Sequence, residues 1–182
     1  MKKVFIDPGH GGRDSGAVWE GVMEKDVVLA IAWGLRKSLE EGDYAATMSR
    51  VDDTFVGLSR RCQMANIMGS DIFLSIHCNA DPDADAPGDP VARGEEVWIR
   101  PSCPDSLHLA RCIQKYAKTF ASVLRGIKES NNLAVLRGTE MPAALVEVGF
   151  VDDPSFTNKL PIESIVQGLK AAVEEYFNAA DT

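Results

Sequence analysis

Apolar residues along the chain follow two spacings, which predict alternating strands and helices. Between residues 24 and 41 they recur every fourth position, as in an amphipathic helix. Related patterns predict helices over 58–68, over 107–124 and around 165–176. Short apolar runs predict strands at 4–6, 44–49, 71–77, 96–99, 133–136 and 143–148.

Two segments lack either pattern and are expected to be loops. Residues 7–23 contain five glycines, and residues 80–94 contain three prolines and four aspartates. Because strands alternate with helices, we predict an α/β fold with a mostly parallel sheet covered by helices on both faces. We find no internal repeat or linker, so residues 1–182 are predicted to form a single domain.

Composition narrows the class of protein. The chain has 182 residues, 45% of them hydrophobic, and a net charge of −8. It is therefore neither a disordered tail nor a fibre, and a surface this acidic should repel nucleic acid and anionic membranes. We expect a monomer with no nucleic-acid and no membrane partner.

Four scattered cysteines and a short apolar run near the N-terminus indicate the cellular compartment in which the chain is made. The cysteines form no C-x-x-C pair, so we expect small buried side chains rather than disulfides or a cysteine zinc site. The run after Met1-Lys2-Lys3 is too short for a secretory signal. We expect cytoplasmic synthesis, with an excised domain of an exported protein as the alternative.

Three polar residues interrupt or end apolar runs, and they are the candidates for chemistry. His10 follows the first strand, His77 closes the strand at 71–77, and Glu147 lies inside the run 143–150. Strand ends are where open α/β sheets bind ligands, and two imidazoles with a carboxylate suit zinc. We predict His10, His77 and Glu24 as the metal ligands, with Glu147 left free to accept a proton from water.

Each assignment has a structural alternative. Either histidine could be a hydrogen-bonded core residue, and Glu24 could only stabilise the start of a helix. Glu147 could pair with Arg50 or Arg137. His108 lies in a helical stretch, and we interpret it as a surface or packing residue.

Several segments together resemble the zinc-dependent N-acetylmuramoyl-L-alanine amidases of bacterial cell-wall turnover. The similarity runs in order from about residue 3 to 177. The matching stretches are 7–12 (DPGHGG), 24–25 (EK), 49–53 (SRVDD) continuing through Arg60, Ala65 and Asn66, 74–80 (LSIHCNA) and 145–150 (LVEVGF).

The resemblance implies a fold, a cofactor and a reaction. The expected fold is a mostly parallel sheet of about six strands with helices on both faces. It implies one Zn²⁺ per chain on His10, Glu24 and His77, with Glu147 as the catalytic acid/base. The expected substrate is peptidoglycan or a muropeptide, cut between N-acetylmuramic acid and L-alanine after release to the wall, as by an autolysin or endolysin.

The sequence departs from the family in two places. Asp152 and Asp153 stand where the family usually has Ser or Thr and then Asn, which bears on the local turn and substrate contacts. Residues 80–94 are too short for the helical plug of some relatives, so we expect a site that is open without an activator. The competing hypotheses are a zinc peptidase or amidohydrolase acting on another peptidoglycan amide, and a catalytically silent wall-binding module.

Overall fold

A six-stranded sheet forms the centre of the molecule, in a computed structural model that describes residues 1–81 and 93–180. The strand order is β4-β1-β5-β8-β6-β7, with β6 antiparallel to β8 and the other pairs parallel. This confirms the predicted α/β fold with a mostly parallel sheet. The strands are β1 (Lys2–Pro8), β4 (Tyr44–Met48), β5 (Ile72–Asn79), β6 (Glu95–Ile99), β7 (Leu124–Glu129) and β8 (Ala143–Phe150).

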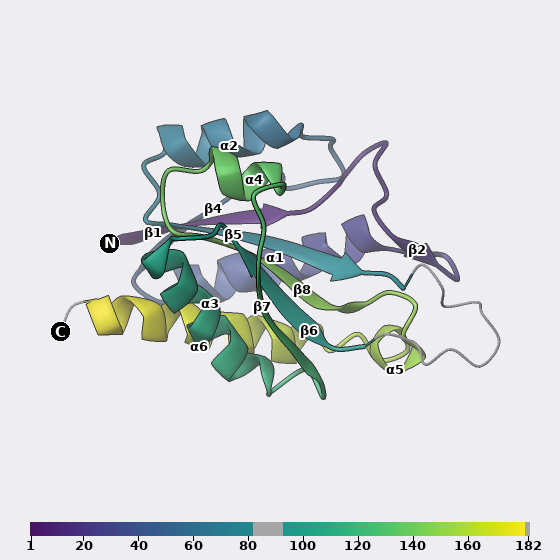
Figure 1. The fold of residues 1–182 in the computed structure, drawn as a ribbon. Coiled ribbons are helices and arrows are strands. Elements are labelled where there is room, and N and C mark those ends of the chain that lie inside the picture. Colours follow the sequence, from purple (N-terminus) through teal and green to yellow (C-terminus); the bar gives the residue numbers. More distant parts are fainter. Residues whose placement is uncertain (82–92, 181–182) are drawn as a thin grey trace.

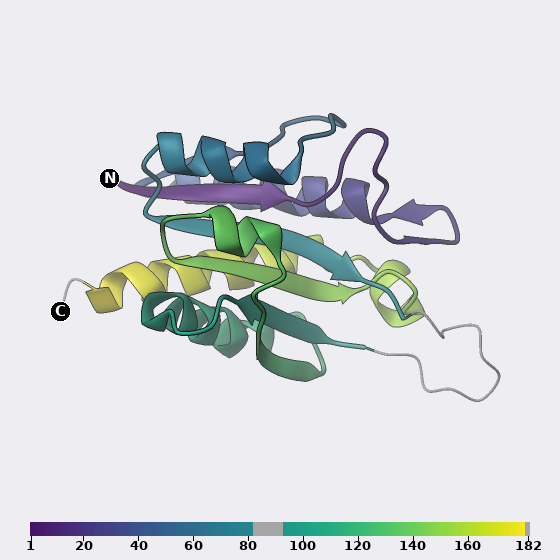
Figure 2. The ribbon, with the colours of Figure 1, turned by 45° about the horizontal axis from the view of Figure 1, so that its top comes forward.

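Helices cover both faces of the sheet (Figures 1 and 2). One face carries α1 (Glu24–Glu40), α3 (Pro104–Ala117) and α6 (Ile162–Ala180). The other carries α2 (Leu58–Ile67) and α4 (Ala134–Gly138). A two-stranded hairpin, β2 (Val18–Trp19) with β3 (Val22–Met23), precedes α1, and a short helix α5 (Pro154–Thr157) follows β8.

Alternation along the strands divides the core in two. Val4 and Ile6 of β1 belong to the larger cluster beneath α1, α3 and α6, whereas Phe5 points to the α2 and α4 side. There Phe5 stacks on Phe73 of β5 with ring centroids 5.7 Å apart. Because side chains alternate, Asp7 and His77 project from the same face as these two rings.

That second face is only partly covered. In both ribbon views α4 lies over the first parts of β5 and β8, while α2 lies beside β1, and the carboxyl ends of β5 and β8 extend past α4. The fold thus leaves a place for chemistry where the sequence put His77 and Glu147.

Two predicted elements were wrong. Residues 133–136 were expected to be a strand, but this run leads into α4, where Val135 and Leu136 pack beside α2. A run of four apolar residues does not distinguish a strand from a helix, and the contacts decided. The helix predicted over 107–124 ends at Ala117, and β7, which the sequence analysis missed, begins at Leu124.

Three further expectations concern the cysteines, the loop at 80–94 and a membrane-spanning helix. All four cysteines are free, and three of them are buried. Residues 82–92 of the loop predicted at 80–94 lie outside the described residues, so the expected open site is not tested there. Among the residues that the structure describes, no helix is both long and apolar enough to span a membrane.

Candidate metal centre

His10 lies two residues beyond the end of β1, in a backbone conformation that is unusual for a residue with a side chain. Its φ is 58°, in the left-handed region, which costs roughly 1–2 kcal/mol for an L-residue. Two arginines hold this turn. Arg50 donates to the carbonyls of Pro8 and Gly9, and Arg61 donates to those of Pro8 and His10. These bonds compensate for the strained backbone that presents the imidazole.

Arg61 also forms a buried ion pair beneath the turn. Its Nη1 lies 2.7 Å from Oδ1 of Asp7, and both side chains are at most 3% exposed. Ser49 and Ser75 donate their hydroxyls to the same carboxylate at 2.6 and 2.8 Å. The resemblance singled out Arg60, which is exposed; the arginine that supports the site is its neighbour. No local pattern distinguishes these two adjacent arginines in the sequence.

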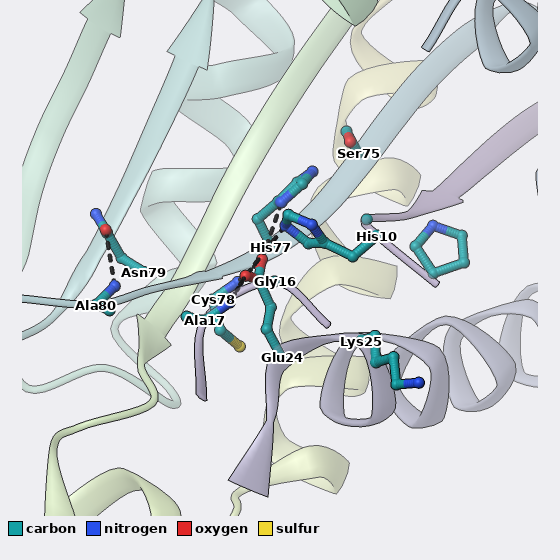
Figure 3. Close-up of polar contacts among 12 residues, drawn as sticks. His10, Gly16, Ala17, Glu24, Lys25, Ser75, His77, Cys78, Asn79 and Ala80 are labelled. Carbon is teal, nitrogen blue, oxygen red and sulfur yellow. Dashed lines mark hydrogen bonds and ion pairs between the residues drawn. The ribbon is translucent and has the colours of Figure 1, made fainter. Parts of the chain in front are cut away.

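Glu24 is the first residue of α1, and its carboxylate lies between the two histidines (Figure 3). Oε2 is 3.1 Å from Nε2 of His10, and Oε1 is 2.9 Å from Nδ1 of His77. The amides of Ala17 and Cys78 donate to the same oxygens. Although burial opposes ionisation, bonds to both histidines lower the pKa of Glu24 to about 2. The residue therefore remains an anion across the physiological pH range.

Glycines bring these groups close together. A Cβ on Gly9 would collide with the His77 ring, and one on Gly16 would collide with the Glu24 carboxylate. The loop that links His10 to Glu24 is thus fitted tightly around the side chains it brings together. Glycine at these two positions therefore allows the backbone of segment 7–23 to approach the side chains of His77 and Glu24 closely.

His10, Glu24 and His77 form a set of donors that suits a metal ion. One ligand atom from each lies within 4.8 Å of the others, and Glu24 is 4% exposed. In a tetrahedral zinc site with bonds of 2.0–2.1 Å, neighbouring ligand atoms are about 3.4 Å apart. The two contacts to Glu24, at 3.1 and 2.9 Å, are slightly shorter than that spacing. On the other side of the His10 ring, Asp14 Oδ1 lies 3.0 Å from Nδ1.

Glu147 lies beside this cluster, directly opposite His77 in the pairing of β8 with β5. Its Oε2 is buried and hydrogen bonds to no described residue. Burial, together with the negative charges of Glu24 and Glu96, raises the pKa of Glu147 to about 7, against the opposing effect of the histidines. A carboxyl with that pKa can take up and release a proton near neutrality.

The two arginines that were considered as partners of Glu147 bind other groups. Arg50 donates to backbone carbonyls, and Arg137 donates to the carbonyl of Asn131. Among the described residues, neither forms an ion pair with Glu147.

Asp152 and Asp153, where the sequence departs from the family, organise the turn after β8. Asp153 caps α5 by accepting from the amide of Ser155, and Asp152 accepts from the amide of Asp81.

His108 lies outside the cluster. It is in α3, on the opposite face of the sheet, with its ring 5.4 Å from that of Tyr176. The residue is exposed and contacts one aromatic ring, in agreement with the predicted surface or packing role.

An apolar cavity of about 450 Å³ adjoins the cluster. His10 and His77 form one wall, and segments 55–58 and 132–135 supply apolar side chains such as Phe55, Leu58 and Leu133. The cleft can accommodate a ligand next to the two imidazoles.

Comparison with known proteins is consistent with this arrangement. Residues 4–175 match the family model described as N-acetylmuramoyl-L-alanine amidase. The sporulation-specific N-acetylmuramoyl-L-alanine amidase of Bacillus subtilis (strain 168) is 37% identical over 190 residues, which cover 100% of this chain and 71% of that protein.

Two solved structures are similar over nearly their whole length. The crystal structure of N-acetylmuramoyl-L-alanine amidase from Clostridium difficile 630 is 36% identical, with a TM-score of 0.88 and 97% of each chain covered. The catalytic domain of the amidase CwlV from Bacillus (Paenibacillus) polymyxa var. colistinus is 31% identical, with a TM-score of 0.86. That match covers 98% of this chain and 99% of the other.

Proposed function

Since the chain belongs to the N-acetylmuramoyl-L-alanine amidase family, we propose that it is a zinc-dependent hydrolase of peptidoglycan. It cleaves the amide between the lactyl group of N-acetylmuramic acid and L-alanine. One zinc ion is held by His10, Glu24 and His77, and residues 1–182 act as a single catalytic domain, as a monomer, on the cell wall. The observation that carries this proposal is the convergence of two imidazoles and a buried carboxylate beside a second carboxyl, whose Oε2 hydrogen bonds to none of the residues that the structure describes.

The fit of the donor set to zinc rests on chemistry and packing. Two neutral imidazoles and one carboxylate are a ligand set of catalytic zinc sites, which keep a further position for water or substrate. When bound, zinc would lower the pKa of water and polarise the substrate carbonyl. The low pKa of Glu24 keeps its carboxylate ionised, as ligation requires.

Glu147 moves the proton in this reaction. It accepts a proton from the attacking water and delivers it to the amide nitrogen as the carbon–nitrogen bond breaks. The products are a free lactyl carboxylate and an L-alanine with a free amino group. Because Oε2 has no hydrogen-bond partner among the described residues, the carboxyl is free to exchange this proton.

The test combines metal content with product identity. Purified chain should contain one zinc per chain by elemental analysis, and chelation should abolish hydrolysis of muropeptides until zinc is restored. Mass spectrometry should find the two new ends described above. Other new ends would indicate a different amidohydrolase, and binding to peptidoglycan without any product would indicate a silent module.

Two histidine variants separate ligation from general damage. His77→Ala removes a proposed ligand and should abolish zinc binding and turnover. His108→Ala removes a histidine on the opposite face and should retain both. Full zinc content in His77→Ala would refute the proposed ligand set.

A further inference from the structure

A row of polar residues crosses the sheet from the proposed metal centre to its edge. His77 of β5 is opposite Glu147 of β8, and Glu147 is opposite Glu96 of β6. Directly opposite residues on paired strands share a face. On β7, the next strand, Arg125 and Lys128 both reach the carboxylate of Glu96. The proposed hydrolysis does not use these last three residues.

Glu96 bridges the two cations. Its Oε2 is 2.7 Å from Nε of Arg125 and 2.6 Å from Nζ of Lys128, while Trp98 donates to Oε1 at 2.9 Å. Glu96 itself is 2% exposed. Although burial opposes ionisation, the bonds from Lys128, Arg125 and Trp98 lower the pKa of Glu96. One anion and two cations leave this cluster with a net charge of +1.

The two cations are held in place, yet they remain accessible. The Arg125 guanidinium lies 5.1 Å from the ring centroid of Phe150, and the Lys128 ammonium lies 5.1 Å from that of Trp98. Each side chain is 34% exposed. These contacts hold both side chains, and about a third of each still meets solvent beside the row that leads to Glu147.

Donors remain for a ligand. Arg125 uses Nε for Glu96, and its two terminal nitrogens form no hydrogen bond with any described residue. Lys128 has three donors and uses one for Glu96. A guanidinium with two free nitrogens is suited to a carboxylate, which it can bind through two parallel hydrogen bonds.

The position of the cluster indicates which half of the substrate it meets. Glu147 delivers its proton to the leaving amine, so the peptide half lies on the Glu147 side of the metal ligands. Neighbouring strands are about 4.8 Å apart, which places β7 roughly 10 Å from β8. An extended peptide advances about 3.3–3.6 Å per residue, so the second peptide residue comes within reach of a long arginine side chain.

The side of the metal ligands that faces away from Glu147 is apolar. The apolar cavity next to His10 and His77 is lined by segments 55–58 and 132–135, and neither Glu147 nor Arg125 contributes to it. The surroundings of the centre are thus apolar on the side of His10 and cationic on the side of Glu96. This asymmetry gives a bound substrate a direction.

We propose that Arg125 and Lys128, bridged by Glu96, form a subsite that binds a free carboxylate on the residue after L-alanine. The inference rests on the proposed amidase function and names its specificity determinant on the peptide side. Arg125 and Lys128 contact the substrate, while Glu96 acts as a positioning residue that holds both cations.

The test compares two synthetic muramoyl-L-alanyl peptides that differ in one group. In one the next residue is D-isoglutamate, with a free carboxylate; in the other it is D-isoglutamine, with an uncharged carboxamide. For the full zinc-loaded chain we expect kcat/KM to favour the carboxylate by about 10- to 100-fold, the usual effect of a charge-assisted hydrogen bond. Arg125→Gln should reduce that preference to within about threefold, mainly by raising KM for the acidic peptide.

Control and second variants complete the design. Arg111→Gln, on exposed α3 surface at the opposite face, should keep the full preference. If Arg125→Gln does not fold, Lys128→Gln tests the same point, since the pair of Glu96 with Arg125 remains. Hydrolysis of both peptides at equal kcat/KM by the unmodified chain would overturn the subsite and leave the amidase proposal standing. Hydrolysis of neither peptide by zinc-loaded chain would overturn both.

Discussion

His77 and Glu147 occupy directly opposite positions on the paired strands β5 and β8. A proposed metal ligand and the proposed acid/base are thus neighbours in one hydrogen-bonded ladder, where adjacent strands are about 4.8 Å apart. The ladder fixes the separation of their backbones, and both side chains project from the same face. Glu147 can therefore lie beside the metal centre without belonging to the ligand cluster.

Replacement of Glu147 by glutamine should separate proton transfer from metal binding. The variant keeps the shape of the side chain but cannot exchange the proton, so we expect kcat to fall at least about 100-fold. Zinc content by elemental analysis should remain one per chain. Glu140→Gln, a change on the exposed segment before β8, should leave both values unaltered. Loss of zinc from Glu147→Gln would show that Glu147 is a ligand instead.

The ion pair beneath His10 should be important for stability. Arg61→Gln would leave the buried carboxylate of Asp7 without its cation and the carbonyl of His10 without its donor. Removal of one partner from a buried pair costs about 3–5 kcal/mol, and we expect that loss in the free energy of unfolding. Zinc affinity should also fall, because His10 loses a bond that holds its turn.

Arg60→Gln provides the matched control for Arg61. Arg60 is adjacent and exposed, so its replacement should change stability by no more than about 0.5 kcal/mol. Urea unfolding of both variants measures the difference. Equal stability of the two variants would contradict the role assigned to Arg61.

Glu95 should make stability depend on pH. The residue is fully buried at the start of β6, and neither oxygen hydrogen bonds to a described residue. Burial, with the negative charge of Glu96 adding to it, raises the pKa of Glu95 from 4.5 to about 7. Between these values the unfolded chain ionises while the folded chain keeps the proton, so the contribution of Glu95 to stability falls as pH rises.

Glu95→Gln should remove this penalty, since glutamine resembles the protonated acid. At about pH 8 the variant should be more stable than the unmodified chain by up to about 3 kcal/mol, and at about pH 5 by less than about 1 kcal/mol. Urea unfolding at both pH values provides the measurement. Glu129→Gln, at the exposed end of β7, should show no such difference. A gain that is the same at both pH values would argue against a raised pKa.

Local patterns were reliable where the residues themselves dictate the conformation. The four-residue stripe from Val27 to Leu39 predicted α1 to within one residue, since one apolar face must meet the core. The half-exposed β7 has no such stripe, and Gly126 interrupts it with a φ of 92°. Its sequence therefore did not distinguish a strand from the end of the preceding helix.

The sequence by itself determined the alternation of strands and helices, and it supplied the four chemical groups, His10, Glu24, His77 and Glu147, through motifs that can be read locally. Only the tertiary structure decided that Arg61 rather than Arg60 supports His10, and that Glu96 holds Arg125 and Lys128 beside Glu147. The reason is physical. A motif lies in contiguous residues, whereas these contacts join residues 29 to 54 positions apart through the order and register of the strands.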